Sequence, residues 1–382
     1  MARRLRSLLA AGLALVMTQA AAAPGFAPVA FASLPGWQED AHEDALAAFR
    51  LSCSAIIHGA VKGGALVATH GAALADACRL AAALPARPAR AAARAFFEAN
   101  FAAYAMPGEQ GFVTAYFEPV FRGALAPDAR YRYPLYAAPP ELVPLGRGPR
   151  PEDLPDGLEA ARRTAHGLSP MPTRAEIEAG ALAGRGLEIL WLESPVDAFY
   201  VHIQGSARIV LPDGEEVRTG FAAKNGHPYT AIGRVMLDRG LIERGNSGMA
   251  AIRAWLEANP ARTPEILNEN RSFIFFTLTR GLEPSLGPVG AQGVNLTAGR
   301  SIAVDQDLHA YGMPVWIDAT LPGDTGDYPF RRLTIAQDTG SAIKGWARDD
   351  LFLGSGEAAG RAAGEVRHQA DFIVLLPRGS AP

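Results

Sequence analysis

The feature that most constrains the fold is a change in sequence pattern near residue 111. Residues 40–105 are rich in alanine, and their apolar side chains recur at the spacing of one helix face. After Gly111 the chain consists of short apolar runs separated by turn residues, which is typical of strands in a β protein. The pattern therefore predicts N-terminal helices followed by a mainly β structure, with strands in the segments 111–120, 187–195, 198–217, 272–278 and 371–377.

Two further helices are expected within the β region. One begins after Thr173, because Thr173 and Glu176 have the spacing of a capping box. The other covers 248–260 and ends at Asn259-Pro260, since the residue before a proline disfavours the helical conformation.

Size and charge limit the class of protein. With 382 residues, of which 49% are apolar and 20% charged, the chain can form one or two globular domains with ample core. The net charge of −3 gives no basic surface of the kind that nucleic-acid binding requires. We therefore expect no nucleic-acid partner.

Residues 1–22 have the pattern of a secretory signal peptide. A basic start is followed by an apolar run from Leu8 to Met17 and by a small-residue cleavage site that ends at Ala22. A membrane anchor is the alternative, but this run is too short to span a bilayer, and no later segment reaches about 18 uninterrupted apolar residues. No cysteine lies near the cleavage site, so we expect no lipid anchor there.

The only two cysteines, Cys53 and Cys78, lie in adjacent helical segments. Export to an oxidising compartment favours a disulfide between them. Two buried free thiols are the alternative.

The tetrapeptide Asp338-Thr339-Gly340-Ser341 is the one with which a pepsin-like protease presents each catalytic aspartate. A second Asp-Thr-Gly begins at Asp324, but the segment 321–327 consists of turn residues and is expected to be a surface loop. Asp338 instead follows the apolar run 333–336, which indicates a buried strand. Because a protease dyad needs two carboxylates that share a proton, the protease interpretation is left with one suitable aspartate and needs a partner from elsewhere in the chain.

Asp338 and Asp350 flank a turn of small residues that contains Lys344. A compact loop would bring both carboxylates to one cleft, where they would suit acid–base chemistry on a glycosidic bond or a peptide. The alternative is that both aspartates cap turns and that Lys344 pairs with one of them.

Three segments, 116–119, 202–206 and 224–230, carry aromatic and amide side chains that suit sugar binding. Each is weak evidence alone, because aromatic residues such as Tyr116 are more often part of a core. His202 and His227 are candidate metal ligands, but no His-x-x-x-His pattern or cysteine pair accompanies them. We therefore expect no metal.

Five segments, in order, resemble the MltA family of lytic murein transglycosylases over about residues 40–378. They are GFVTAYFEPV (111–120), YVHIQGSARIVLPDG (200–214), KNGHPYTAIGRVML (224–237), GPVGAQGVNLTAGRSIAVD (287–305) and AQDTGSAIKGWARDDLFLGSG (336–356). Residues 285–377 resemble the 3D domain, which is named for three aspartates, here Asp305, Asp338 and Asp350.

The resemblance implies a double-psi β-barrel that carries a smaller inserted β domain, with the active groove between them. The inserted domain is expected at 130–235. The barrel and its N-terminal helices would then comprise 23–129 and 236–382, so that strands near Phe112 and Phe372 share a sheet.

The resemblance also implies residue roles. Asp350 matches the single catalytic acid/base, and Asp338 matches the supporting aspartate. The neighbouring Asp349 could also occupy the catalytic position of the family, although the sequence Asp-Leu-Phe favours Asp350. Asp349 is expected to point to solvent. The residues expected to bind substrate are Thr114, Tyr116, Glu118, Gln204, Ser206, Asp305 and Lys344. Ala115 and Phe117 depart from the residues that are frequent in the family.

The implied activity is that of a peptidoglycan lytic exotransglycosylase, a carbon–oxygen lyase that needs no cofactor. It would cleave the β-1,4 bond between N-acetylmuramic acid and N-acetylglucosamine and leave a 1,6-anhydromuramoyl end. The alternatives are a hydrolase that uses Asp338 with Asp350 and a non-catalytic glycan-binding module. The protein is expected to be a periplasmic monomer, with glycan strands as ligand and proteins of wall synthesis or division as candidate partners.

Overall fold

The structure is a computed structural model. It describes residues 25–59, 61–106, 111–146, 154–245, 248–281, 283, 286–323 and 325–379. The predicted signal peptide and Asp324 lie outside these residues, so their interpretation stays a prediction.

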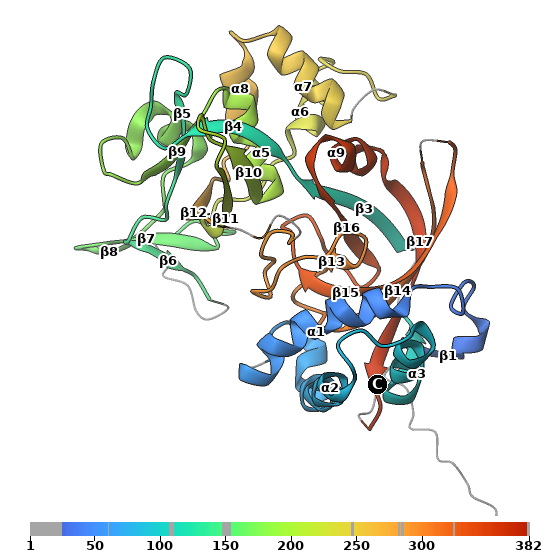
Figure 1. Ribbon diagram of the computed structural model, residues 1–382. Helices are drawn as coiled ribbons and strands as arrows, with labels where there is room; N and C mark the ends of the chain where they lie inside the picture. Colours follow the sequence, from blue (N-terminus) through green and yellow to red (C-terminus); the bar gives the residue numbers. More distant parts are fainter. Residues whose placement is uncertain are drawn as a thin grey trace, which may run out of the picture.

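A closed barrel forms one half of the molecule (Figure 1). Its ring runs β17-β14-β15-β13-β16-β3, and β3 pairs again with β17 to close it. Two further strands, β1 and β2, extend the sheet from β17. The strands are β1 (Ala27–Val29), β2 (Phe101–Ala105), β3 (Gly111–Glu118), β13 (Ser301–Ala303), β14 (Pro314–Leu321), β15 (Tyr328–Asp338), β16 (Arg348–Ser355) and β17 (Arg367–Pro377).

The closure confirms the prediction of a mainly β fold built on a barrel. The ring contains two parallel pairs, β13–β15 and β16–β3, an arrangement consistent with a double-psi barrel. Phe112 of β3 pairs with Gln369 of β17, so the strands near Phe112 and Phe372 share a sheet as expected.

Both faces of the barrel wall are buried near the N-terminal helices. Along β14, Val315 and Ile317 belong to the barrel interior, whereas Trp316 faces the helices. The helices are α1 (His42–His58), α2 (Ala65–Ala83) and α3 (Arg90–Asn100), with a short 3-10 turn η1 (Phe31–Ser33) before them.

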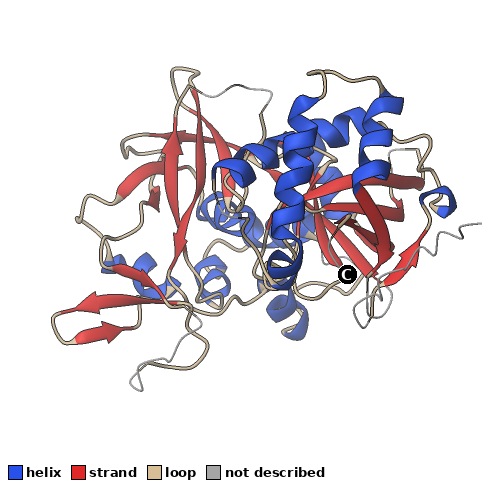
Figure 2. Cartoon of the chain, turned by 90° about the horizontal axis from the view of Figure 1, so that it is seen from below, coloured by secondary structure: helices blue, strands red, loops and turns tan. Residues whose placement is uncertain are grey.

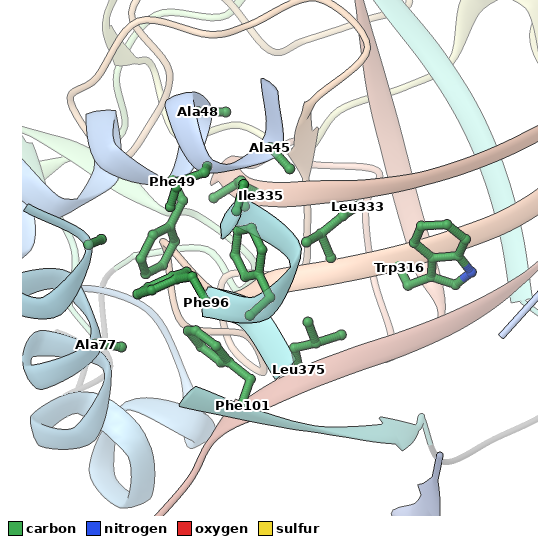
Figure 3. Packing of buried hydrophobic residues seen from close by; sticks show 14 of the residues in the cluster. Ala45, Ala48, Phe49, Ala77, Phe96, Phe101, Trp316, Leu333, Ile335 and Leu375 are labelled. Carbon is green, nitrogen blue, oxygen red and sulfur yellow. The ribbon is translucent and has the colours of Figure 1, made fainter. Parts of the chain in front are cut away.

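Aromatic side chains join these helices to the barrel (Figure 3). Phe49 lies within 6.0 Å of Phe97 and 5.8 Å of Phe101, measured between ring centroids. Burying a phenylalanine contributes roughly 1.5–3 kcal/mol, so this cluster is a main source of stability. A buried ion pair between Asp40 and Arg300 adds a polar link, with two nitrogen–oxygen distances of 2.9 Å.

A second unit lies beside the barrel, and strands gather in two separate regions in Figure 2. Its main sheet has the order β12-β11-β10-β4-β9-β5, and a smaller one the order β6-β7-β8. The strands are β4 (Val120–Ala124), β5 (Tyr133–Tyr136), β6 (Leu142–Pro144), β7 (Ala160–Thr164), β8 (Gly167–Ser169), β9 (Glu188–Leu192), β10 (Ser206–Val210), β11 (Glu216–Lys224) and β12 (Ile274–Thr279).

Strands β4 and β12 of this sheet lie outside the range 130–235 expected for the inserted domain. We therefore propose that the inserted unit extends from about residue 120 to residue 279. The remaining helices are α4 (Arg174–Glu176), a π-helical turn η2 (Ile177–Ala181), α5 (Pro195–Gln204), α6 (Ile232–Asp238), α7 (Met249–Ala258), α8 (Thr263–Asn268) and, in the barrel half, α9 (Gly356–Glu365).

The helix predictions hold where capping signals were used. Thr173 and Glu176 form the capping box before α4, and α7 covers the segment predicted to end at Asn259. The prediction of a strand over 198–204 is wrong, because α5 occupies it. Ser194 caps the start of α5, and Gly205 ends it with a φ of 75°, which suits glycine alone.

The predicted disulfide is confirmed, since Cys53 of α1 is bonded to Cys78 of α2. It closes a loop between two helices that cover the barrel.

We expect the intact protein to resist alkylation until a reductant is added. Replacing both cysteines with alanine should lower the free energy of unfolding by about 3 kcal/mol, because the crosslink restricts the unfolded chain. Denaturant unfolding of the two proteins measures the difference. Full alkylation without reductant would contradict the bridge.

Candidate active site

The candidate site lies at one end of the barrel, where four strands bring polar residues into register. Ala303 of β13 pairs with Asp338 of β15 on one side and with Asp350 of β16 on the other. Thr114 of β3 pairs with Asp350 from the opposite edge of β16. Since adjacent strands are about 4.8 Å apart, the Cα atoms of the two aspartates are separated by roughly 10 Å, with only a methyl side chain between them.

Asp350 is partly buried and is held by its neighbours. The Thr114 hydroxyl donates to Asp350 Oδ1 at 2.5 Å, and Arg348 donates to the same hydroxyl at 3.0 Å. Burial raises the pKa of Asp350 to about 6 against the opposing effects of Thr114 and Arg348, and the Asp338 carboxylate adds to the rise. Asp350 can therefore carry a proton near neutral pH.

Asp338 accepts two hydrogen bonds that orient it. The Tyr116 hydroxyl donates to Oδ2 at 2.7 Å, and the backbone N–H of Ala291 donates to Oδ1 at 2.9 Å. Burial raises the pKa of Asp338, while these two bonds favour its ionised form. The loop that carries Ala291 can approach because residue 290 is glycine, since a Cβ there would lie 2.7 Å from the Gln337 carbonyl oxygen.

Tyr116 is the side-chain donor to Asp338 and lies within the electrostatic influence of both aspartates. Burial raises its pKa well above the ordinary value, and the nearby carboxylates of Asp338 and Asp350 act in the same direction. Its ring lies 5.4 Å from that of Phe352, measured between centroids. Tyr116 therefore stays a hydroxyl donor over the whole physiological pH range.

Asp349 does not point to solvent, which corrects the sequence-based expectation. Successive residues of a strand face opposite sides, so Asp349 turns into the barrel interior with Leu351, beside Val113. Its side chain is fully buried, and neither oxygen has a hydrogen-bond partner among the described residues. Burial raises its pKa well above the usual range, so the group is held as a neutral acid away from the cleft.

Glu118 is also not open to a ligand, contrary to the expectation that it lines a glycan groove. It is fully buried, and Arg208, Arg218 and Ser355 donate to its oxygens. Ser206 is buried as well. Gln204 accepts from the backbone N–H of Phe117 and donates to the sulfur of Met249.

Asp305 and Lys344 lie in two loops beside the site, Asp305 after β13 and Lys344 between β15 and β16, and their side chains form an ion pair at 3.5 Å. Asp305 is buried and accepts from the backbone N–H groups of Asp307 and Gly345 at 3.0 and 2.9 Å. Burial opposes ionisation, but these bonds and the ammonium of Lys344 bring the pKa of Asp305 below its usual value. Asp305 thus organises the loop, whereas the side chain of Lys344 is 58% exposed and pairs with Asp305 and Asp307.

A cavity of about 470 Å³ adjoins these residues. Ala291 connects it to the aspartates, because this residue lines the cavity and also donates to Asp338. The lining residues are Lys62, Gly63, Ala291, Gln306, Asp307 and Tyr311.

The histidines considered as metal ligands have other partners. His202 accepts from the backbone N–H of Ile274 at 2.9 Å, and His227 bonds the Met171 carbonyl oxygen at 2.7 Å. No group of three His, Cys, Asp or Glu side chains able to hold a metal occurs within the part of the chain that the structure describes.

Comparisons with known proteins agree with this architecture. Residues 112–277 match the model of the MltA specific insert domain, and residues 300–376 match that of the 3D domain. Membrane-bound lytic murein transglycosylase A of Vibrio cholerae is 34% identical over 262 residues, which are 67% of this chain and 62% of that protein. The match thus spans less than two thirds of that relative.

Solved structures of related proteins align with a larger share of this chain. A membrane-bound lytic murein transglycosylase from Agrobacterium tumefaciens is 41% identical, with a TM-score of 0.86 over 93% of this chain and 98% of the other. The chain belongs to the MltA family. Escherichia coli MltA with bound chitohexaose is 28% identical, with a TM-score of 0.60 over 81% of this chain and 83% of the other.

For this member of the MltA family, the structure brings together Asp350, Asp338, Thr114 and Tyr116 from the expected residues. It adds two that the sequence-based reasoning missed, Arg348 and the N–H of Ala291. Ala291 lies in a segment already noted for its family resemblance, but a backbone donor leaves no trace in the side-chain pattern. Arg348 shows only as a charge two residues before Asp350.

We expect Asp349→Asn to weaken the pH dependence of folding. The native state keeps a proton on Asp349 that the unfolded chain releases above about pH 4, so this residue lowers stability as pH rises. Asparagine is neutral throughout, and the loss of stability between pH 4 and 7 should become smaller. Glu357→Gln, on an almost fully exposed side chain, is the control and should leave the profile unchanged. An unchanged profile in Asp349→Asn would show that the carboxyl is already ionised in the native state.

Proposed function

We propose that the protein is a lytic transglycosylase that cleaves the β-1,4 bond between N-acetylmuramic acid and N-acetylglucosamine in peptidoglycan. The observation that carries the proposal is Asp350, a partly buried carboxyl with a pKa of about 6 beside a second, fixed aspartate. Family membership and the chitohexaose bound to the Escherichia coli relative support a glycan as ligand.

In the first step Asp350 enters protonated and donates to the glycosidic oxygen that leaves with N-acetylglucosamine. The bond from C1 of the muramoyl residue to that oxygen breaks. The raised pKa of Asp350 serves this step, because a carboxyl with an ordinary pKa would hold no proton near neutral pH.

In the second step Asp350, now a carboxylate, takes the proton of the muramoyl 6-hydroxyl. The hydroxyl oxygen bonds to C1 and closes the 1,6-anhydro ring, so Asp350 regains its proton and no water is consumed. An internal nucleophile makes a second catalytic carboxylate unnecessary, since its position replaces the activation of a water.

Asp338 supports this cycle through charge and position. Its carboxylate raises the pKa of Asp350, and its bonds to Tyr116 and Ala291 hold it in place. Positive charge that develops at C1 during bond cleavage would also be stabilised by a carboxylate nearby.

The location and assembly of the protein remain proposals. We propose a monomeric periplasmic protein that is exported by its N-terminal segment and meets wall synthesis or division proteins at the glycan. Among the described residues, no helix has the length and apolar character needed to cross a membrane.

The pH dependence of turnover tests the acid role. We expect kcat to fall as pH rises through about 6, because deprotonated Asp350 cannot donate. In Asp338→Asn this limb should move to lower pH, since removing a neighbouring negative charge lowers the pKa of Asp350. A limb that rises with pH in the wild type would contradict the acid role.

The products test the reaction type. Digestion of purified sacculi should release muropeptides lighter than hydrolytic products by one water, as measured by mass spectrometry.

Asp350→Asn should lower kcat by about 10²–10⁴ while it retains binding of chitohexaose. Asp349→Asn is the matched control and should retain near-normal turnover, because its side chain faces the barrel interior. Muropeptides that carry the added water would instead indicate a hydrolase.

A further inference from the structure

The two units are joined by two chain crossings. The outward crossing runs from β3 of the barrel into β4 of the inserted unit, a continuous ribbon in Figure 1. The return crossing follows β12 and includes Leu286 and Gly287. A hinge between the units would have to bend at both crossings.

One buried cluster holds both crossings. Glu118, the last residue of β3, accepts from Arg208 Nε at 3.0 Å and from Arg218 Nε and Nη2 at 2.5 and 3.1 Å. Arg208 belongs to β10 and Arg218 to β11, so both guanidinium groups come from the inserted sheet. The Ser355 hydroxyl, at the end of barrel strand β16, donates to Glu118 Oε2 at 2.6 Å.

The same guanidinium groups hold the return crossing. Arg218 donates to the carbonyl oxygens of Leu286 and Gly287 at 2.7 and 3.1 Å, and Arg208 donates to that of Leu286 at 3.0 Å. The side chains of Glu118 and Arg218 are 0% and 4% exposed. Loss of one member would leave buried charges without partners, so the cluster strongly favours one arrangement of its elements.

We propose that Glu118, Arg208 and Arg218 are positioning residues that fix the angle between the barrel and the inserted unit, and thereby the width of the glycan groove that the family resemblance implies between them. Glu118 and Arg218 do so without touching the glycan, because both side chains are buried. The part of this inference that concerns glycan rests on the function proposed above, whereas the part that concerns the angle does not.

The position of the proposed catalytic groups determines how a less fixed angle between the two units would affect Kd and kcat. Asp350, Asp338, Thr114 and Tyr116 all lie on barrel strands. A change in angle therefore moves the inserted unit relative to the proton-transfer groups, which themselves stay on the barrel. If roughly one molecule in ten kept the competent angle, apparent Kd would rise about tenfold while kcat for bound substrate changed little.

Distances between labels on the two units test the inference directly. The only native cysteines are bonded to each other, so cysteines introduced at Asp213 and Asp327 can be labelled selectively with spin labels. Asp213 lies in the exposed turn between β10 and β11, and Asp327 in the exposed turn between β14 and β15. Double electron–electron resonance then reports the separation of the inserted unit from the barrel.

Glu118→Gln should broaden or shift the distance distribution and should raise the Kd for chitohexaose, with kcat on glycan strands changed much less. The matched control is Asp40→Asn, which breaks an equally buried Arg–Asp pair between the N-terminal region and the barrel. It should lower thermal stability but leave the distances and the Kd unchanged. If Glu118→Gln does not fold, Arg208→Gln, which keeps the pair of Glu118 with Arg218, takes its place with the same expectation.

A folded variant whose distance distribution matches the wild type would overturn the inference. Equal broadening in Asp40→Asn would also overturn it, because the effect would then be general loosening. A third outcome is broadening in Glu118→Gln alone, with no chitohexaose bound by any of the proteins. It would support the role of the cluster in fixing the angle and count against the proposed function.

Discussion

The pairing of β13 with strands on both of its sides is the constraint on which the site depends. This short strand holds Asp338 and Asp350 at one level of the barrel, because Ala303 pairs with both. The barrel must close through β3 and β17 for Thr114 and Tyr116 to reach the same aspartates. A site of this kind is a property of the closed ring rather than of any one loop.

Three neighbouring carboxyl groups, Asp338, Asp349 and Asp350, differ in their burial and in the hydrogen bonds that they receive. Asp338 receives donors from Tyr116 and Ala291 and stays oriented, whereas Asp350 receives one from Thr114. Asp349 receives none and is enclosed by the barrel interior. Residues of one chemical type thus differ in function because burial and hydrogen bonding differ at positions a few ångströms apart.

Much of the fold could be predicted from local signals, and most failures have one physical origin. The N-terminal helices, the capping box at Thr173 and the disulfide depended on neighbouring residues or on compartment, and they were correct. The expectations for Asp349 and Glu118 failed because the face of a strand residue is set by barrel closure and by sheets formed from distant segments. The arginine partners of Glu118 are 90 and 100 residues away along the chain, and Ser355 is 237 residues away. The helix α5 is different, since Ser194-Pro195 and Gly205 signalled it, but the aromatic and β-branched residues between them favoured a strand.

We infer that Asp350 exchanges its proton near neutral pH while Asp349 stays neutral inside the barrel. Carboxyl carbon NMR of protein labelled with ¹³C at aspartate, assigned through Asp350→Asn and Asp349→Asn, measures both groups in the same titration. We predict a midpoint of about 6 for Asp350 and a protonated shift for Asp349 that persists well above the pH at which ordinary aspartates ionise. A midpoint for Asp350 near the ordinary value of about 4, with Asp349 ionised at the same pH, would contradict the account.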